Sequence, residues 1–135
     1  MNYETILREH QLKVTPQRLG ILHLMQTMGH VDIEELYVSM KKQFSSISLA
    51  TLYKNVNAML ENRLISEIKV PQLKSKYEIA KEPHIHLLCD NCSEFIDLDV
   101  DVACIMDEAS DKSHYKLLKS NIVLSGLCQK CQSSV

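Results

Sequence analysis

Apolar residues recur at helical spacing through the first sixty residues, with polar caps between the apolar runs. Thr15 precedes Pro16, which suits an N-cap followed by the first helical position. Asp32 precedes Glu35 by three residues, which is a capping-box pattern, and Ser48 can cap the next apolar run. The spacing therefore predicts four helices, at residues 3–12, 16–28, 33–42 and 49–60.

The pattern changes to alternation after residue 63. Residues 64–70 and 76–79 alternate apolar and polar positions, and the turn at 71–75 begins with Pro71. Three helices followed by a hairpin bearing Lys69, Lys74 and Lys76 are typical of a winged helix-turn-helix, in which the hairpin lies along the DNA backbone.

A second, smaller unit is expected after Lys81-Glu82-Pro83. Strands are predicted at 85–88, 95–97 and 116–124, and a helix at 101–113. The fold class is therefore α+β, with a winged-helix domain at 1–80, a hinge at 81–83 and a small α/β domain at 84–135.

Composition adds a requirement for the smaller domain. The chain has 135 residues, of which 45% are hydrophobic. A domain of about 55 residues is marginal on its own hydrophobic burial and often needs a metal or a partner chain. No apolar run approaches the roughly 18 residues of a membrane span, and no secretory start is seen, so we expect a cytoplasmic protein with reduced thiols and no membrane partner.

Charge is unevenly distributed between the two parts. Residues 1–80 hold ten Lys/Arg and eight Asp/Glu, whereas residues 81–135 hold five and nine. The first part is therefore the better candidate for a polyanion partner, and the second for cations.

Two Cys-x-x-Cys pairs stand 35 residues apart in the second domain. Cys89 and Cys92 form the first pair, and Cys128 and Cys131 close the chain. Thiolates at this spacing can complete a tetrahedron around zinc, and four of them leave no open position for catalysis. Two redox dithiols are the alternative. Cys104 has no partner in the sequence and is expected to be a buried small apolar residue.

A second donor set adjoins the first cysteine pair. His84 and His86 are two residues apart on a predicted strand, so they point to one face, and Asp97 on the neighbouring strand can face them. Imidazoles with a carboxylate suit Fe²⁺, Mn²⁺ or Zn²⁺. Glu78 and His30 are weaker candidates from pattern alone.

The polar face of the helix at 49–60 contains no acid before Glu61. A solvated face usually mixes both signs, so this face is typical of a helix that enters a groove lined by phosphates. The face, with its cap, comprises Ser48, Ala50, Thr51, Tyr53, Lys54 and Asn57.

Four segments in this order resemble the ferric uptake regulator family of bacterial metal-dependent repressors. They are Lys13-Val-Thr-Pro-Gln-Arg18, Ser48-Leu-Ala-Thr-Leu-Tyr53-Lys54, His84-Ile-His86-Leu-Leu-Cys89-x-x-Cys92 and Cys128-x-x-Cys131. The resemblance implies a homodimer that binds palindromic double-stranded DNA, with an N-terminal winged helix and a C-terminal dimerisation domain.

The resemblance also assigns ligands. It implies structural zinc at the four cysteines, and regulatory Fe²⁺ or Mn²⁺ at His30, Glu78, His84, His86 and Asp97. DNA contacts are expected from Lys13 and Arg18, from the helix at 49–60, which would be the recognition helix, and from Lys69, Lys74 and Lys76 of the hairpin, which would be the wing.

The branch of the family is predicted from a few positions. The aspartate at position 97 is similar to that of the peroxide sensors, whereas the glutamate at position 78 departs from the aspartate usual there. A third metal site found in many iron regulators has no match here. We expect a repressor released when peroxide oxidises its iron site. The alternatives are an iron-responsive uptake regulator of the same family and, more distantly, a small non-haem iron enzyme using His84, His86 and Asp97.

Overall fold

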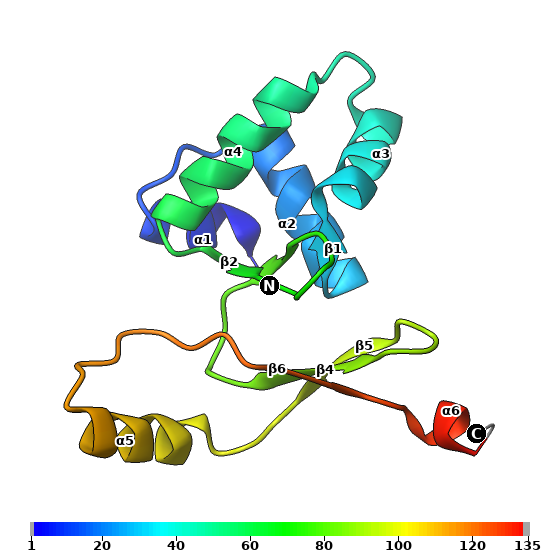
Figure 1. Ribbon diagram of the computed structural model, residues 1–135. Coiled ribbons are helices and arrows are strands. Elements are labelled where there is room, and N and C mark those ends of the chain that lie inside the picture. The colour runs from blue at the N-terminus through cyan, green and yellow to red at the C-terminus, as the bar shows by residue number, and fades with distance from the viewer. Residues whose placement is uncertain (1, 134–135) are drawn as a thin grey trace. The chain divides into compact units, whose positions relative to one another are not determined.

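The computed structural model describes residues 2–133 and divides the chain into two compact units, Met1–Lys81 and Glu82–Val135. The N-terminal unit holds four helices and a three-stranded sheet (Figure 1). Its elements are α1 (Tyr3–Glu9), α2 (Pro16–Met28), β1 (Val31–Asp32), α3 (Ile33–Gln43), α4 (Leu49–Glu61), β2 (Ile65–Ile68) and β3 (Lys76–Ile79).

The predicted caps define where these helices begin. The Thr15 hydroxyl accepts the Arg18 amide at 3.2 Å, Asp32 accepts that of Glu35 at 2.8 Å, and Ser48 accepts that of Thr51 at 3.1 Å. Each bond satisfies a donor that the first helical turn would otherwise leave without an intrahelical partner.

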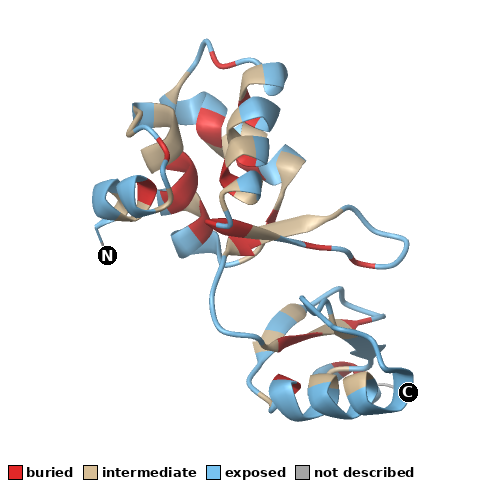
Figure 2. Cartoon of the chain, turned by 90° about the vertical axis from the view of Figure 1, so that its left-hand side faces the viewer, coloured by how far each residue is buried: buried red, intermediate tan, exposed pale blue. Residues whose placement is uncertain are grey.

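The core of the N-terminal unit lies where the three longer helices meet the sheet. Leu22, Met25, Leu36, Leu52 and Met59 are each at most 1% exposed. Figure 2 shows these buried segments in red, gathered inside the unit. This burial fixes α4 against α3 and β2 and leaves its polar face outside.

The sheet has the order β1-β3-β2 and is antiparallel throughout. β2 and β3 form the predicted hairpin, with Ile65 opposite Ile79 and Ile68 opposite Lys76. The two-residue strand β1, which the sequence pattern did not predict, pairs with β3. The winged helix-turn-helix prediction is confirmed.

The C-terminal unit is a small α/β arrangement built on one three-stranded sheet. Its central strand β4 pairs antiparallel with β5 and parallel with β6. Its elements are β4 (Ile85–Cys89), β5 (Phe95–Leu98), α5 (Val102–Ser113), β6 (Val123–Gly126) and α6 (Gln129–Gln132).

Two predicted element boundaries are corrected. The first helix ends at Glu9 rather than residue 12, because Gln11 adopts φ 61° and the Leu12 amide turns back to the Leu7 carbonyl. The last strand begins at Val123 rather than residue 116, because β4 offers backbone partners only from His86 to Cys89. Leu49 shares the helical spacing of the buried Leu52 and Val56, but it is 43% exposed at the first turn of α4.

Cys104 is exposed, contrary to the prediction of burial. It lies on α5, where Val102 is the one buried residue, so most of this helix has no apolar layer over it within the described chain. No helix within residues 2–133 combines the length and apolar character that a bilayer span needs.

Candidate metal centres

The four paired cysteines come together because β4 and β6 are parallel neighbours and their C-terminal ends lie side by side. Cys89 is the last residue of β4, and the parallel register places it opposite Gly126 at the end of β6. Cys128 follows two residues later as the N-cap of α6, and Cys131 lies within that helix. Cys92 lies in the tight turn that follows β4, where Ser93 adopts φ 64°.

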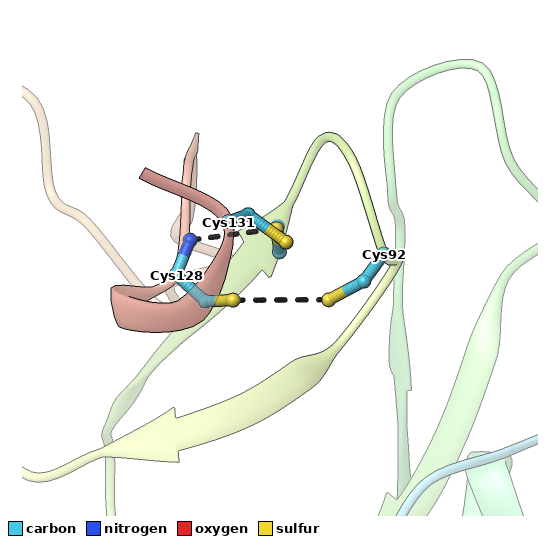
Figure 3. Close-up of side chains that lie close together, drawn as sticks. Cys92, Cys128 and Cys131 are labelled. Atoms are coloured by element: carbon cyan, nitrogen blue, oxygen red, sulfur yellow. Dashed lines mark hydrogen bonds between the residues drawn. The ribbon is translucent and has the colours of Figure 1, made fainter. Parts of the chain in front are cut away.

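The geometry of the four sulfurs matches a tetrahedral zinc site. All four Sγ atoms lie within 4.8 Å of one another, and Cys92 Sγ is 3.8 Å from Cys128 Sγ. Figure 3 shows Cys92, Cys128 and Cys131 pointing toward one another from the turn and from α6. Ligands about 2.3 Å from a tetrahedral zinc would stand about 3.8 Å apart.

Backbone amides prepare one of these thiols to ionise. The Cys92 and Cys128 amides lower the pKa of Cys89 to about 6, and the Cys128 amide donates to Cys89 Sγ at 3.4 Å. The Glu94 amide lowers the pKa of Cys92, but the neighbouring Cys89 and burial outweigh it and raise that pKa to about 12. The neighbouring sulfurs thus shift the pKa of one thiol down and that of another up, and a bound cation would favour the ionised form of both.

His84, His86 and Asp97 form a second cluster in the same unit. His86 lies opposite Asp97 across β4 and β5, and its Nε2 is 3.1 Å from Asp97 Oδ1. His84 Nε2 lies 3.0 Å from His86 Nε2 and 3.6 Å from Asp97 Oδ1. The strand pairing therefore aims two imidazole nitrogens and a carboxylate oxygen at one place.

Nearby groups orient the two rings. His84 Nδ1 lies 2.9 Å from the Glu82 carbonyl, which can only accept, so Nδ1 donates to that carbonyl and Nε2 is turned toward His86 and Asp97. His86 is 4% exposed and stacks on Phe95 at a centroid distance of 5.1 Å. Rings held in this way present Nε2 to a metal without further rearrangement.

The remaining two predicted ligands form a pair within the N-terminal unit. His30 precedes β1 and Glu78 lies on β3, and the β1–β3 pairing of Val31 with Tyr77 brings them together. His30 Nε2 is 3.2 Å from Glu78 Oε2, and Glu78 is 5% exposed. Two of the five predicted regulatory ligands thus belong to the N-terminal unit and three to the C-terminal unit.

The predicted DNA-facing side chains of α4 lie on its outer face. Ala50, Tyr53, Lys54 and Asn57 are exposed, and Thr51 is half-buried. The Ser48 hydroxyl donates to Thr51 Oγ1 at 2.9 Å, so these two hydroxyls belong to the helix cap.

The predicted basic contacts divide into two kinds. Lys13 and Lys69 are exposed, Lys76 is half-buried, and the Lys74 ammonium contacts the Glu34 carboxylate at the surface. Arg18 instead bonds to Asn55 on α4 and to the Lys13 carbonyl. Sequence reasoning missed Asn55, although its helical spacing from Leu52 and Met59 placed it toward the buried side of α4.

A winged helix joined to thiolate and imidazole–carboxylate donor sets defines a metal-binding regulator of the winged-helix class. The sequence model described as the Ferric uptake regulator family matches residues 9–125. The chain belongs to the ferric uptake regulator family, which confirms the resemblance seen in its sequence. It is accordingly a metal-responsive regulator, in a family of DNA-binding transcriptional regulators rather than enzymes.

Relatives in both branches cover almost the whole chain. The peroxide operon regulator of Bacillus subtilis is 27% identical over 127 residues, covering 93% of this chain and 88% of that protein. The ferric uptake regulation protein of Synechococcus elongatus is 33% identical over 135 residues, covering 96% and 92%. The crystal structure of the Campylobacter jejuni peroxide stress regulator is 36% identical with a TM-score of 0.74, covering 97% of this chain and 100% of that one.

Proposed function

We propose that this chain is a homodimeric, metal-dependent repressor that binds a palindromic operator and is released when peroxide oxidises its iron site. The observation that supports it most is the pair of donor clusters. His30 and Glu78 belong to one unit, and His84, His86 and Asp97 to the other. One ion shared by all five would couple metal binding to the orientation of the DNA-binding unit.

Cys89, Cys92, Cys128 and Cys131 would hold structural zinc. The sulfur spacing and the lowered pKa of Cys89 fit a four-thiolate site. The ion would fasten the chain end to β4 in a unit that buries few apolar side chains.

The three imidazoles and two carboxylates of the regulatory set suit Fe²⁺ or Mn²⁺. When bound, Fe²⁺ supplies the one-electron reduction of peroxide that Mn²⁺ does not. The rings of His30, His84 and His86 are then the oxidisable ligands, and an oxidised ring binds metal more weakly. The chain would therefore release both metal and DNA after peroxide exposure.

DNA recognition would use α4 in the major groove, flanked by Lys13 and by Lys69, Lys74 and Lys76 of the wing. A symmetric dimer would place two such helices on half-sites about one DNA turn apart, which requires a palindrome. Metal and DNA would then raise each other's affinity by the same factor.

Dimerisation is supported by apolar side chains that the C-terminal unit leaves outside its own core. They lie on α5, on the segment before β6 and on the outer strands. The most exposed of them are Ile105, Tyr115, Leu118 and Leu124. A second copy could cover this surface, as the family resemblance implies.

Two observations support the peroxide branch. Asp97 is similar to peroxide sensors, and the C. jejuni peroxide stress regulator shares 36% identity. The second candidate is an iron-responsive uptake regulator, favoured by the 33% identity with the S. elongatus ferric uptake regulation protein. In that case the metal occupancy of the regulatory site alone would control DNA binding, and peroxide would have no separate effect on DNA affinity.

One experiment separates these candidates. A duplex is first selected from a random-sequence pool with the Mn²⁺-loaded protein. Binding to that duplex is then measured with Fe²⁺ or Mn²⁺, before and after hydrogen peroxide, and the protein is digested for mass spectrometry. We expect peroxide to abolish binding of the Fe²⁺ form only, with one added oxygen atom on a peptide containing His30, His84 or His86.

Two other results would reject parts of this proposal. An Fe²⁺ form that keeps its DNA affinity after peroxide would select the iron-responsive alternative. If the protein binds no duplex with either metal, the proposal that it is a repressor is rejected.

A further inference from the structure

We propose that Arg18 is a positioning residue, which holds the recognition helix α4 against the loop before α2, rather than a contact to the DNA backbone. This inference rests on the proposed DNA-binding function of α4. It revises the expectation that Arg18, as part of a basic loop-and-helix segment, touches a phosphate.

The Arg18 side chain links two segments that are distant in sequence. Its Nε donates to Asn55 Oδ1 on α4 at 3.2 Å, and its Nη1 donates to the Lys13 carbonyl at 3.0 Å. Because guanidinium can only donate, the oxygen of the Asn55 amide must face Arg18. Its nitrogen is then turned to Gln17 Oε1 at 3.4 Å.

The backbone of Arg18 is fixed as well. Its amide donates to the Thr15 hydroxyl at the start of α2, so the residue cannot shift along the helix without breaking the cap. Arg18 and Asn55 are both half-buried, and their hydrogen bond is partly shielded from water. The planar Arg18 guanidinium binds two uncharged oxygens, one on α4 and one in the loop that carries Lys13. Because its backbone is also fixed, the side chain sets the distance between these two segments.

This arrangement matters because Lys13 and α4 are the two proposed DNA-contacting parts on either side of the bond. Asn55 lies two residues from Tyr53 and from Asn57, both on the outer face of α4. A small rotation of α4 would therefore misplace side chains that read bases, while the surface charge of the unit would change little. Three N–H groups of the guanidinium remain, so a direct phosphate contact is the competing role to exclude.

Salt dependence separates the two roles. The full-length Mn²⁺-loaded protein is compared with Arg18→Gln and Arg18→Lys on the selected duplex and on an unrelated duplex of equal length. For a positioning residue, both variants should lose about tenfold in affinity for the selected duplex, because a single ammonium cannot reproduce the fork. Affinity for the unrelated duplex and the slope of log affinity against log salt should stay unchanged.

A phosphate contact gives the opposite pattern. Arg18→Gln would weaken both duplexes alike and lower the slope by about 0.9, and Arg18→Lys would restore most of the loss. That result would overturn the proposal. Lys13→Ala, at an exposed lysine of the same loop, is the control expected to lower the slope.

Asn55 provides an independent arm. Asn55→Ala should reproduce most of the effect of Arg18→Gln, and the loss in the double variant should be clearly smaller than the sum of the two single losses, because both single variants remove the Arg18–Asn55 bond. Fully additive losses would contradict the proposal.

Amide hydrogen exchange tests the link without DNA. Arg18→Gln should speed exchange in the first turns of α4 and leave α3 unchanged. If α3 also loses protection from exchange, the Arg18→Gln variant has unfolded. The exchange of α4 is then compared in Arg18→Lys and Asn55→Ala to test whether the Arg18–Asn55 bond holds this helix. Should the parent protein bind no duplex, the proposed function fails, whereas the exchange result still supports or rejects the bond between the two helices.

Discussion

The two units of this chain reach order by different means. The N-terminal unit surrounds a continuous core drawn from all four of its helices and from β1 and β2. In the C-terminal unit, the buried apolar side chains among the described residues are Ile85, Cys89, Val102 and Cys131, and two of these are proposed zinc ligands. Figure 2 shows the contrast in the amount of red in each unit. The first unit is stabilised by hydrophobic burial, whereas the second buries few apolar side chains, which is typical of a small domain that relies on a metal or a partner chain.

Loss of zinc should have the largest effect and should strike one unit only. Cys131→Ser, or a strong chelator, is expected to unfold residues 82–133 while the helices of residues 2–81 persist, because a structural zinc contributes about 10–16 kcal/mol in small zinc domains. Zinc content and amide exchange of each unit measure this. Cys104→Ser is the matched control and should change neither, and equal unfolding of both units would contradict the comparison.

A cavity in the N-terminal core should come next. Leu36→Ala removes a side chain that is 0% exposed and should lower the free energy of unfolding of this unit by about 2–5 kcal/mol. Chemical denaturation followed by helical circular dichroism gives the value. Val38→Ala on the same helix, at 59% exposure, should stay within about 0.5 kcal/mol. Similar losses in the two variants would show that burial does not stabilise this unit.

The apolar surface of the C-terminal unit should matter for association rather than folding. The double variant Ile105→Ala, Leu118→Ala removes side chains that are 48% and 82% exposed. It should weaken the proposed dimer by about 1–3 kcal/mol in analytical ultracentrifugation, with zinc content unchanged. An unaltered dimer constant would place the interface elsewhere on this unit.

The smallest expected effect concerns a helix cap. Ser48→Ala removes the hydroxyl that accepts the Thr51 amide and should lower stability of the N-terminal unit by about 1 kcal/mol. Thermal unfolding would detect the change. Ser46→Ala in the preceding turn is the control, and a loss of equal size there would argue against a cap effect.

Local sequence rules were sufficient where the stabilising contacts are local. The caps at Thr15, Asp32 and Ser48 and the hairpin ending at Ile79 are read directly from residue spacing. The spacing within each Cys-x-x-Cys pair and within His84-x-His86 likewise predicts side chains that point to one place, because a tight turn or a strand fixes their directions.

Local rules failed where a partner outside the segment decides. The strand predicted at 116–124 begins only at Val123, because β4 is too short to pair with residues 116–122. Cys104 was predicted to be buried because cysteine is a small apolar residue, but within the described residues no layer covers this side of α5. Asn55 was not among the predicted site residues, because its partner Arg18 is 37 positions away in the sequence.

The parallel pairing of β4 with β6 has a consequence for biosynthesis. A ribosome delivers the N-terminal unit complete, and that unit can fold while translation continues. The sheet that follows remains open until residues 123–126 emerge, and Cys128 and Cys131 are made after them. A nascent chain therefore exposes Cys89 and Cys92 without their partners until both later cysteines have been made.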